Sequence, residues 1–345
     1  MWQTIGHPKT IDLLKRVFTQ DTASHAYMLV GPPHVGKMTL ALDIARELNC
    51  QADLEQKPCG ECFACRKIAD AKHPDVQILA LNQNGPDEVK EKTEIGIERI
   101  NDMLHSASLP PFEGRYRVYI IDEASNLSTD AANRLLKTLE EPVGKIIFLL
   151  LTSNTAKIPT TVISRCQKLV LNRVKTVEIE RELVERWRVE PEKARLLAQL
   201  SHGCPGWGVQ ASTNTELMAE RNSQFEKLVN IMKNSYGERF SISTQLVMQF
   251  ARKREYVYET LDTWAGWWRD ILLAKTGCYD NIVSIDFKPA LAEMARTYQL
   301  VQIKAIIKYF LDAVMQLKQN ANPRLVLDTM MLNIPKTQEP VLDRS

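Results

Sequence analysis

The chain has 345 residues, of which 44% are hydrophobic and 25% are charged, and its formal net charge is +2. These values are ordinary for a globular protein and exclude a disordered chain, a collagen-like fibre and a mini-protein. A charge this close to balance does not by itself demand a nucleic-acid partner. At about 100–200 residues per domain, the length predicts two or three domains.

Up to about residue 170, short apolar runs alternate with helical patterns. The runs that predict strands cover residues 27–30, 76–79, 117–121, 146–152 and 168–171. The helical patterns between them cover residues 37–48, 94–107 and 129–139. Because strands that alternate with helices pair in parallel and are covered on both faces, this part of the chain predicts an α/β domain.

Helical patterns dominate the rest of the chain. Short helices are predicted over residues 173–211, and a longer helical region starts at about residue 212. Three tryptophans have helical spacing and indicate a helix core rather than a base-stacking platform: Trp264, Trp267 and Trp268. The patterns therefore predict an α/β domain, a small helical domain and a larger helical domain, over residues 1–171, 172–211 and 212–345.

No stretch of the chain has the length of a membrane-spanning helix. The longest uninterrupted apolar run, residues 146–151, is far shorter than the roughly 20 residues that a span requires. The first residues also lack the basic segment followed by an apolar stretch that marks a signal peptide. We therefore expect a cytoplasmic protein without a membrane partner.

A candidate phosphate-binding loop joins the first predicted strand to the first helical pattern. The sequence from Gly31 to Lys37, with Gly36 before the lysine, matches GxxxxGK. Backbone N–H groups at the start of such a helix bind phosphate oxygens, and Lys37 would reach the terminal phosphates. Met38 stands where a hydroxyl normally binds Mg²⁺, and Thr39 lies about 100° further round the helix. The motif predicts phosphate-loop ancestry with weakened hydrolysis, and the alternative is a turn that needs glycines only for its geometry.

Two carboxylates follow the third predicted strand. Asp122 would hold Mg²⁺, and Glu123 would polarise an attacking water. Many buried strands end in an acid, so the pair alone is a weak signal. Together with the phosphate loop it predicts a nucleotide site.

Four of the seven cysteines are close together in the sequence: Cys50, Cys59, Cys62 and Cys65. Their spacing, with two overlapping C-x-x-C units, suits one structural Zn²⁺ with four thiolate ligands. Free buried thiols and a redox C-x-x-C motif are the alternatives, and His73 is a fifth candidate ligand if Cys50 does not bind. The other cysteines are expected to be small core residues: Cys166, Cys204 and Cys278.

The motifs in this order resemble the AAA+ clamp-loader subunits of bacterial DNA polymerase III, over nearly the whole chain. The matching segments are the phosphate loop, the zinc segment followed by Lys72-His73-Pro74-Asp75, Asp122-Glu123-Ala124, the run from Asn133 to Pro142, Ser164-Arg165-Cys166, and the runs 268–273 and 320–325. The resemblance implies an AAA+ P-loop domain with a zinc-knuckle insertion at about 50–65. A helical lid and an all-α collar for oligomerisation would follow it.

The resemblance also implies a role in replication. Such a subunit would join gamma/tau motor subunits and a delta subunit in a heteropentamer that loads the sliding clamp onto primed DNA. Arg165 would be an arginine finger that reaches the ATP of a neighbouring motor subunit, worth about 10³ to 10⁵ in rate in other systems. Ser153 falls where the family carries its first nucleotide sensor. A surface salt bridge and a strand-end cap are the alternatives for Arg165 and Ser153.

Three departures from the motor pattern lie on the nucleotide path. His34 replaces a loop glycine, Met38 replaces the magnesium-binding hydroxyl, and Gly206 falls where motor subunits carry a second sensor arginine. We therefore expect a subunit with weak or no ATPase, in which Glu123 is vestigial. The retained Lys37 and carboxylates keep open an active gamma/tau-type motor. A stand-alone zinc-containing nucleic-acid binder is the third alternative, which the charge balance disfavours.

Overall fold

The computed structural model describes residues 1–53, 57–81, 94–107, 109–142, 144–233 and 235–334. The chain divides into two compact units. The first comprises Met1–Arg188 and Ser201–Val209, and the second comprises Val189–Leu200 and Gln210–Ser345. The finer division at residues 171 and 211 stays a prediction.

The first unit holds the strands and the helices that cover them. Its elements in chain order are α1 (Pro8–Thr19), β1 (Ala26–Val30), α2 (Lys37–Asn49), α3 (Phe63–Ala69), β2 (Val76–Leu79), α4 (Ile97–Ala107), β3 (Arg117–Ile121), η2 (Ala124–Asn126), α5 (Thr129–Glu140), β4 (Ile146–Thr152), η3 (Thr155–Lys157), α6 (Thr160–Ile163), β5 (Gln167–Val170) and α7 (Thr176–Trp187). Helix α9 (Pro205–Thr213) begins in this unit.

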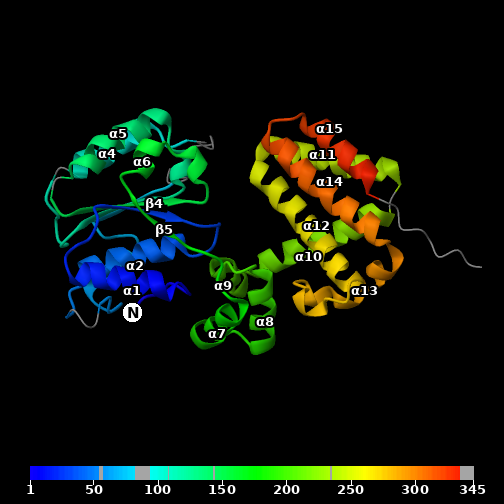
Figure 1. Cartoon of the computed structure of the whole chain (residues 1–345), viewed down its shortest axis with the longest axis horizontal. Coiled ribbons are helices and arrows are strands. Elements are labelled where there is room, and N and C mark those ends of the chain that lie inside the picture. Colours follow the sequence, from blue (N-terminus) through cyan, green and yellow to red (C-terminus); the bar gives the residue numbers. More distant parts are fainter. Residues whose placement is uncertain (54–56, 82–93, 108, 143, 234, 335–345) are drawn as a thin grey trace, which may run out of the picture. The chain divides into compact units, whose positions relative to one another are not determined.

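The five strands form one parallel sheet in the order β2-β3-β4-β1-β5. Alternate side chains of β4 enter two separate cores, with Phe148 on one face and Leu149 on the other. Figure 1 shows α1 and α2 on one face of the sheet, and α4, α5 and α6 on the other. Every residue of β4 is buried, as expected of a strand with both faces covered.

The expected strands are all confirmed, and the parallel α/β architecture with them. The predicted helical pattern at 94–107 is confirmed only from Ile97. The chain before it is extended because Ile95 pairs with Leu127 in an isolated parallel bridge. The N–H of Ile95 donates to the carbonyl of Asn126, and the N–H of Ser128 donates to the carbonyl of Ile95. The sequence patterns do not predict helices α1, α3 and α6.

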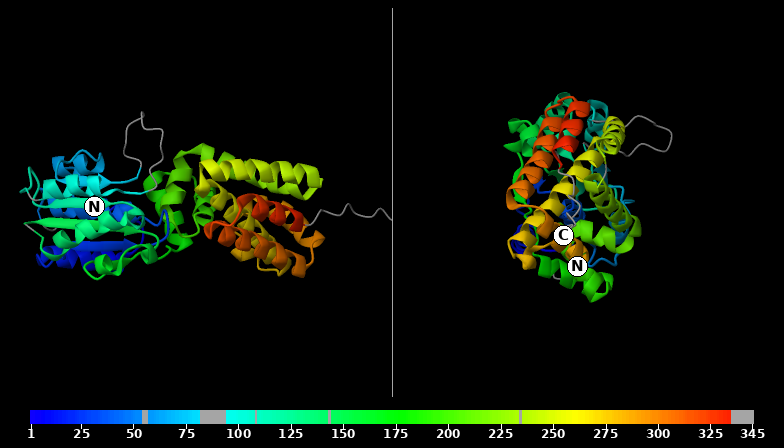
Figure 2. Two further views of the ribbon diagram at one scale, coloured as in Figure 1. Left: turned by 90° about the horizontal axis from the view of Figure 1, so that it is seen from above. Right: turned by 90° about the vertical axis from the view of Figure 1, so that its right-hand side faces the viewer.

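The second unit is helical. It contains α8 (Pro191–Leu200), α10 (Thr215–Lys233), α11 (Tyr236–Arg252), α12 (Arg254–Lys275), η4 (Tyr279–Asn281), η5 (Ile285–Phe287), α13 (Lys288–Thr297), α14 (Leu300–Lys318) and α15 (Pro323–Asn333). Both views of Figure 2 show the long helices of this unit packed side by side. Helix α12 packs against α10, α11, α13 and α14.

The three tryptophans of α12 lie in the core of the second unit. Trp264 and Trp268 are 0% exposed, and Trp267 is 2% exposed. The indole N–H of Trp264 donates to the carbonyl of Gln224 in α10 (3.1 Å). The core interpretation of this helix face is therefore confirmed.

Among the helices that the structure describes, none is both long enough and apolar enough to cross a membrane.

We expect Trp264→Ala to lower the free energy of unfolding by about 3–5 kcal/mol, because it empties a fully buried aromatic site. Denaturant unfolding followed by circular dichroism measures this loss. Val301→Ala is the matched control, since Val301 is 76% exposed on α14 and its truncation should change stability by less than about 0.5 kcal/mol. A loss below about 1 kcal/mol for Trp264→Ala would show that this ring is not a core residue.

Candidate functional site

The candidate phosphate loop connects β1 to α2 and can be built only with glycines at two positions. A Cβ atom at Gly31 would lie 2.6 Å from the carbonyl oxygen of Leu171. Gly36 has a φ of 105°, which L side chains rarely adopt. The N–H of Gly31 donates to the carbonyl of Thr152 at the end of β4 (3.1 Å). The loop therefore lies at the carboxyl edge of the sheet, where the ends of neighbouring strands converge.

Lys37 turns back over its own loop. Its ammonium group donates to the carbonyl oxygens of Gly31 (2.8 Å) and Pro32 (2.9 Å). Burial lowers the pKa of Lys37, and the carboxylates of Asp122 and Glu123 oppose that effect. The structure thus brings together the lysine and both predicted acids.

The residues after Lys37 do not supply a hydroxyl at the usual position. Met38 is half-buried and packs against the core between the sheet and α2. Thr39, one residue further along α2, is also half-buried. The local geometry therefore retains a cradle and a cation for phosphate without the adjacent magnesium ligand.

The backbone of the phosphate loop contacts the start of α9. The N–H of Gly206 donates to the carbonyl of His34 (2.8 Å), and His34 has a left-handed φ of 58°. A Cβ atom at Gly206 would lie 2.8 Å from that same carbonyl oxygen. In this arrangement there is no room for a side chain at position 206.

The other predicted nucleotide residues lie at the ends of β3 and β4. Asp122 is half-buried, and Glu123 is exposed with a left-handed φ of 49°. The amide of Asn126 donates to the carboxylate of Glu123 (3.0 Å). Ser153 is exposed directly after Thr152, which pairs with the last residue of β1, Val30. Gly31, Gly36, Lys37, Thr39, Asp122, Glu123 and Ser153 therefore all sit at or beside the carboxyl edge of the sheet.

Arg165 follows the short helix α6, and its polar partners lie outside the phosphate loop. One terminal nitrogen of its guanidinium donates to the carbonyl of Thr161 (2.8 Å) and approaches the hydroxyl of Ser164 (3.4 Å). The other pairs with the carboxylate of Glu140 at the end of α5. Its side chain is 32% exposed, so part of it still faces solvent.

The four predicted cysteine ligands meet between the end of α2 and the start of α3. The sulfur atoms of Cys50, Cys59, Cys62 and Cys65 all lie within 4.8 Å of one another. The sulfurs of Cys50 and Cys59 are 3.5 Å apart. A tetrahedral Zn–S₄ centre with bonds of about 2.3 Å has sulfur–sulfur distances of about 3.8 Å. The cluster is therefore consistent with a structural zinc site.

Backbone amides around the cluster favour thiolates. The N–H groups of Cys59, Cys62 and Cys65 approach the sulfurs of Cys50, Cys59 and Cys62 at 3.4, 3.3 and 3.5 Å. The amide of Cys62 is the main reason that the pKa of Cys59 falls to about 6. Burial raises the pKa values of Cys50 and Cys65. A bound cation would favour the thiolate at those two positions as well.

Not every cysteine expectation holds. Cys204 is buried and Cys166 is half-buried, but Cys278 is exposed, so its assignment to the core is wrong. It follows Gly277, where the chain leaves α12 in a left-handed turn, and no helix face carries it inward. The alternative ligand His73 is not part of the metal-binding cluster found in the described residues.

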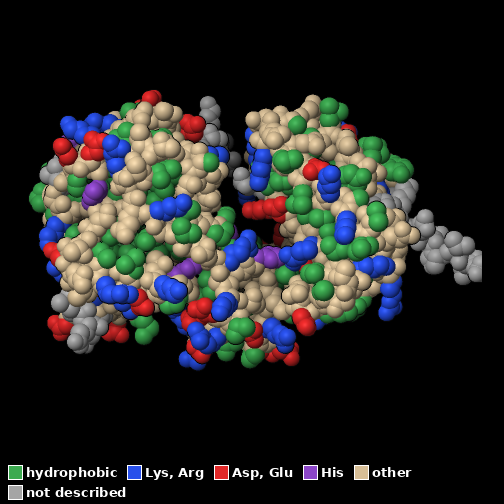
Figure 3. Space-filling view, viewed as in Figure 1, with side chains coloured by type: hydrophobic (Ala, Val, Ile, Leu, Met, Phe, Trp, Pro, Cys, Tyr) green, Lys and Arg blue, Asp and Glu red, His purple; other side chains and the backbone are tan. Residues whose placement is uncertain are grey.

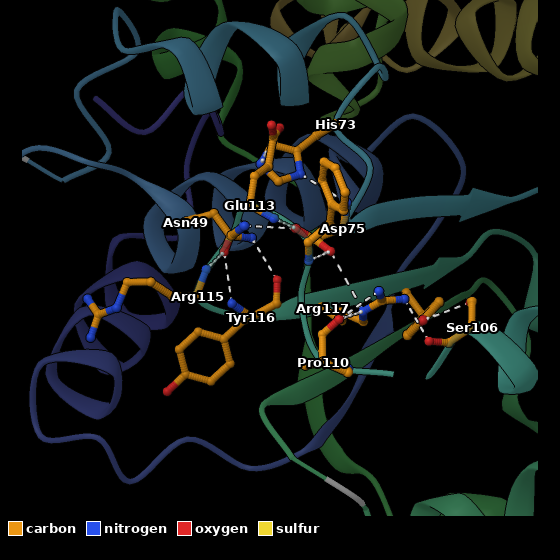
Figure 4. Close-up of polar contacts among 12 residues, drawn as sticks. Asn49, His73, Asp75, Ser106, Pro110, Glu113, Arg115, Tyr116 and Arg117 are labelled. Carbon is orange, nitrogen blue, oxygen red and sulfur yellow. Dashed lines mark hydrogen bonds and ion pairs between the residues drawn. The ribbon is translucent and has the colours of Figure 1, made fainter. Parts of the chain in front are cut away.

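A polar network fixes the cysteine module to the loop before β3 (Figure 4). The side-chain oxygen of Asn49 accepts the N–H groups of Arg115 (2.8 Å) and Tyr116 (2.9 Å). Asn49 is the last residue of α2 and immediately precedes the first cysteine. The module is therefore tied to the segment that continues into β3.

Asp75 holds the same loop from the other side. Its buried carboxylate accepts the N–H groups of Phe112 (2.7 Å), Glu113 (2.9 Å) and Gly114 (2.8 Å). Burial alone would raise the pKa of Asp75, but these amides and Arg117 hold it below its usual range. The ring of His73 accepts the N–H of Asp75 (3.1 Å) and lies 3.6 Å from Glu113. His73 is therefore an anchor of this network.

Sequence reasoning missed three features of the site. It assigned no role to Asn49, to Asp75 or to Glu140. Two consecutive acids at the end of a predicted helix were the available signal for Glu140, because a helix C-terminus disfavours negative charge. For Asn49 and Asp75 no local signal exists, since their partners are distant in sequence.

Comparison with known proteins agrees with the whole-chain resemblance. A family model described as "DNA polymerase III, delta subunit" matches residues 6–175. DNA polymerase III subunit delta' of Bacillus subtilis is 28% identical over 325 residues, which cover 94% of this chain and 95% of that protein.

A second group of subunits is also similar to this chain. DNA polymerase III subunit tau of B. subtilis is 35% identical over 205 residues, 58% of this chain and only 34% of tau. The chain thus spans about a third of that relative. A gamma subunit-related structure from Thermotoga maritima has 16% identity and a TM-score of 0.44, covering 95% of this chain and 99% of that one. Residues 6–175 thus match the DNA polymerase III delta-subunit family, and over almost its whole length the chain is similar to the delta-prime subunit of a bacterial DNA polymerase III.

Proposed function

We propose that this chain is a ring-completing clamp-loader subunit that lends Arg165 to the ATP site of a neighbour. The observation that carries the proposal is the environment of that arginine. Its side chain is 32% exposed, and its polar partners in the described residues lie in or directly after α5 and α6 rather than in the phosphate loop. A planar cation placed beside a γ-phosphate stabilises the charge that develops during phosphoryl transfer.

The phosphate loop of the chain itself supports weak or absent ATPase. Lys37 is engaged by two carbonyls of its own loop, and Met38 offers no oxygen to Mg²⁺. Gly206 contacts His34 where a sensor arginine would need space. The ammonium group of Lys37 has three donors and uses two on its loop, so nucleotide binding through Lys37, with Asp122 as a magnesium ligand, stays compatible with this geometry.

The proposed partners follow the resemblance to the delta-prime subunit. They are gamma/tau motor subunits and a delta subunit in a heteropentamer of the polymerase holoenzyme, the sliding clamp, and primed DNA within the complex. The AAA+ unit would be followed by a helical lid and a collar for oligomerisation. The site of action would be the cytoplasm. The cysteine module would hold one Zn²⁺ in a closed structural site, since four sulfurs leave no open coordination position.

A gamma/tau-type motor is the second candidate, because tau of B. subtilis is 35% identical over 205 residues. A stand-alone nucleic-acid binder has less support. On the face shown in Figure 3, basic and acidic side chains are interspersed on each unit and form no continuous basic stripe. Strong non-specific binding to nucleic acid usually requires such a stripe.

We expect Arg165→Ala to lower hydrolysis at the neighbouring ATP site by about 10³-fold or more, because the transition state loses its positive partner. Single-turnover ATP hydrolysis measures this effect in a ring reconstituted with motor and delta subunits, clamp and primed DNA.

The isolated wild-type chain is the control and should hydrolyse almost no ATP. Substantial turnover by the isolated chain, unaffected by Arg165→Ala, would make it a motor and reject the proposal.

We expect Cys62→Ser to reduce the zinc content from one ion per chain to near zero, because three thiolates bind this metal much more weakly than four. Elemental analysis of the purified protein measures the zinc, and circular dichroism should show an intact helical unit. Cys278→Ser is the matched control, since Cys278 is exposed and outside the cluster. A zinc content that stays at one per chain in Cys62→Ser would refute the site.

A further inference from the structure

We propose that Glu140 is a positioning residue for Arg165, an inference that rests on the proposed function. The side chain of Glu140 pairs with one terminal nitrogen of the Arg165 guanidinium. The carbonyl of Thr161 accepts from the other terminal nitrogen (2.8 Å). Two acceptors on two different nitrogens fix the plane of the group, which a single contact would not do.

The structure holds Glu140 firmly enough for this role. It is the last residue of α5, and the preceding residue, Leu139, is 1% exposed in the core. The ring of His25 lies 2.6 Å from the carbonyl oxygen of Leu139. The carbonyl of His25 in turn accepts the N–H of Phe148 in β4 (2.8 Å). The end of α5 is therefore anchored to the central strand of the sheet.

The backbone of the arginine is fixed as well. Val162 in α6 is fully buried, and its carbonyl accepts the N–H of Arg165 (3.2 Å). The N–H of Cys166 donates to the carbonyl of Ile163 (3.2 Å) just before β5 begins. Helices α5 and α6 also pack against each other. Both members of the ion pair thus project from rigid supports.

Helix stability does not explain a carboxylate at position 140. The C-terminal end of a helix carries a partial negative charge, so acids there are disfavoured and cations are favoured. Here two acids, Glu140 and Glu141, end and follow α5. The pairing with Arg165 offsets this unfavourable placement, which points to a role for the carboxylate outside its own helix.

The pairing leaves the guanidinium able to act on a second molecule. Each terminal nitrogen carries two N–H groups, and a guanidinium has five donors in all. The side chain of Arg165 is 32% exposed and that of Glu140 is 50% exposed. An exposed arginine loses rotamer freedom when it docks on phosphate. Orientation in advance by Glu140 reduces that loss, so the benefit appears in the rate of the chemical step.

The test compares Glu140→Ala and Glu140→Gln in the reconstituted ring, with kcat and the half-saturating ATP concentration measured separately. Glu140→Ala should lower kcat by about three- to fivefold, the effect usual for an exposed ion pair, with little change in the half-saturating concentration. Glu140→Gln keeps a hydrogen-bond acceptor and should recover part of the rate. The double variant Glu140→Ala/Arg165→Ala should be no slower than Arg165→Ala alone, because the carboxylate acts only through the arginine.

Glu141→Ala is the matched control, with the same change of charge one residue further along, and should have the wild-type kcat. The melting temperature of the isolated Glu140→Ala chain should equal that of the wild type, which separates positioning from a folding defect.

A wild-type or higher kcat in Glu140→Ala would overturn the inference, and so would a further loss in the double variant. If Arg165→Ala lowers hydrolysis but Glu140→Ala does not, only this inference fails. If Arg165→Ala has no effect, the proposed function fails with it.

Discussion

The parallel pairing of β1 between β4 and β5 is the constraint on which the candidate site depends. It places the carboxyl ends of β1, β3 and β4 at one edge of the sheet, because parallel strands all end on the same side. The phosphate loop, both acids and Ser153 follow those strand ends directly. The close approach of Gly31 to the carbonyl of Leu171 then fixes where the loop begins.

The first unit contains two candidate sites, the phosphate loop and the surroundings of Arg165. At the carboxyl edge of the sheet, Lys37 donates to two carbonyls of its own loop, Met38 offers no oxygen to Mg²⁺, and Gly206 lies against the carbonyl of His34. At the junction of α5 and α6, the side chain of Arg165 is 32% exposed. A phosphate loop without its magnesium-binding hydroxyl and an arginine whose side chain is partly exposed support the proposal of a subunit that completes its neighbour's ATP site.

The strands could be predicted from sequence because burial on both faces gives continuous apolar runs, as in Ile146–Thr152. The phosphate loop and the cysteine cluster could also be predicted, since their chemistry requires fixed residue types at short spacings. The sequence predicts the start of α4 three residues too early, because the bridge between Ile95 and Leu127 is a tertiary contact. The hydrogen bonds between Asn49 and the loop before β3, and the ion pair of Glu140 with Arg165, could not be predicted for the same reason. Their partners lie 66 and 25 residues away in the chain.

The central claim is that the phosphate loop of this chain contributes little to the ATPase of the ring. The most direct measurement is steady-state ATP hydrolysis by a reconstituted ring in which only this chain carries Lys37→Ala. The account predicts the wild-type rate, because Met38 leaves this loop without the hydroxyl that binds Mg²⁺ in active sites of this kind. A collapse of ATP hydrolysis in this ring would show that the site turns over and would contradict the account.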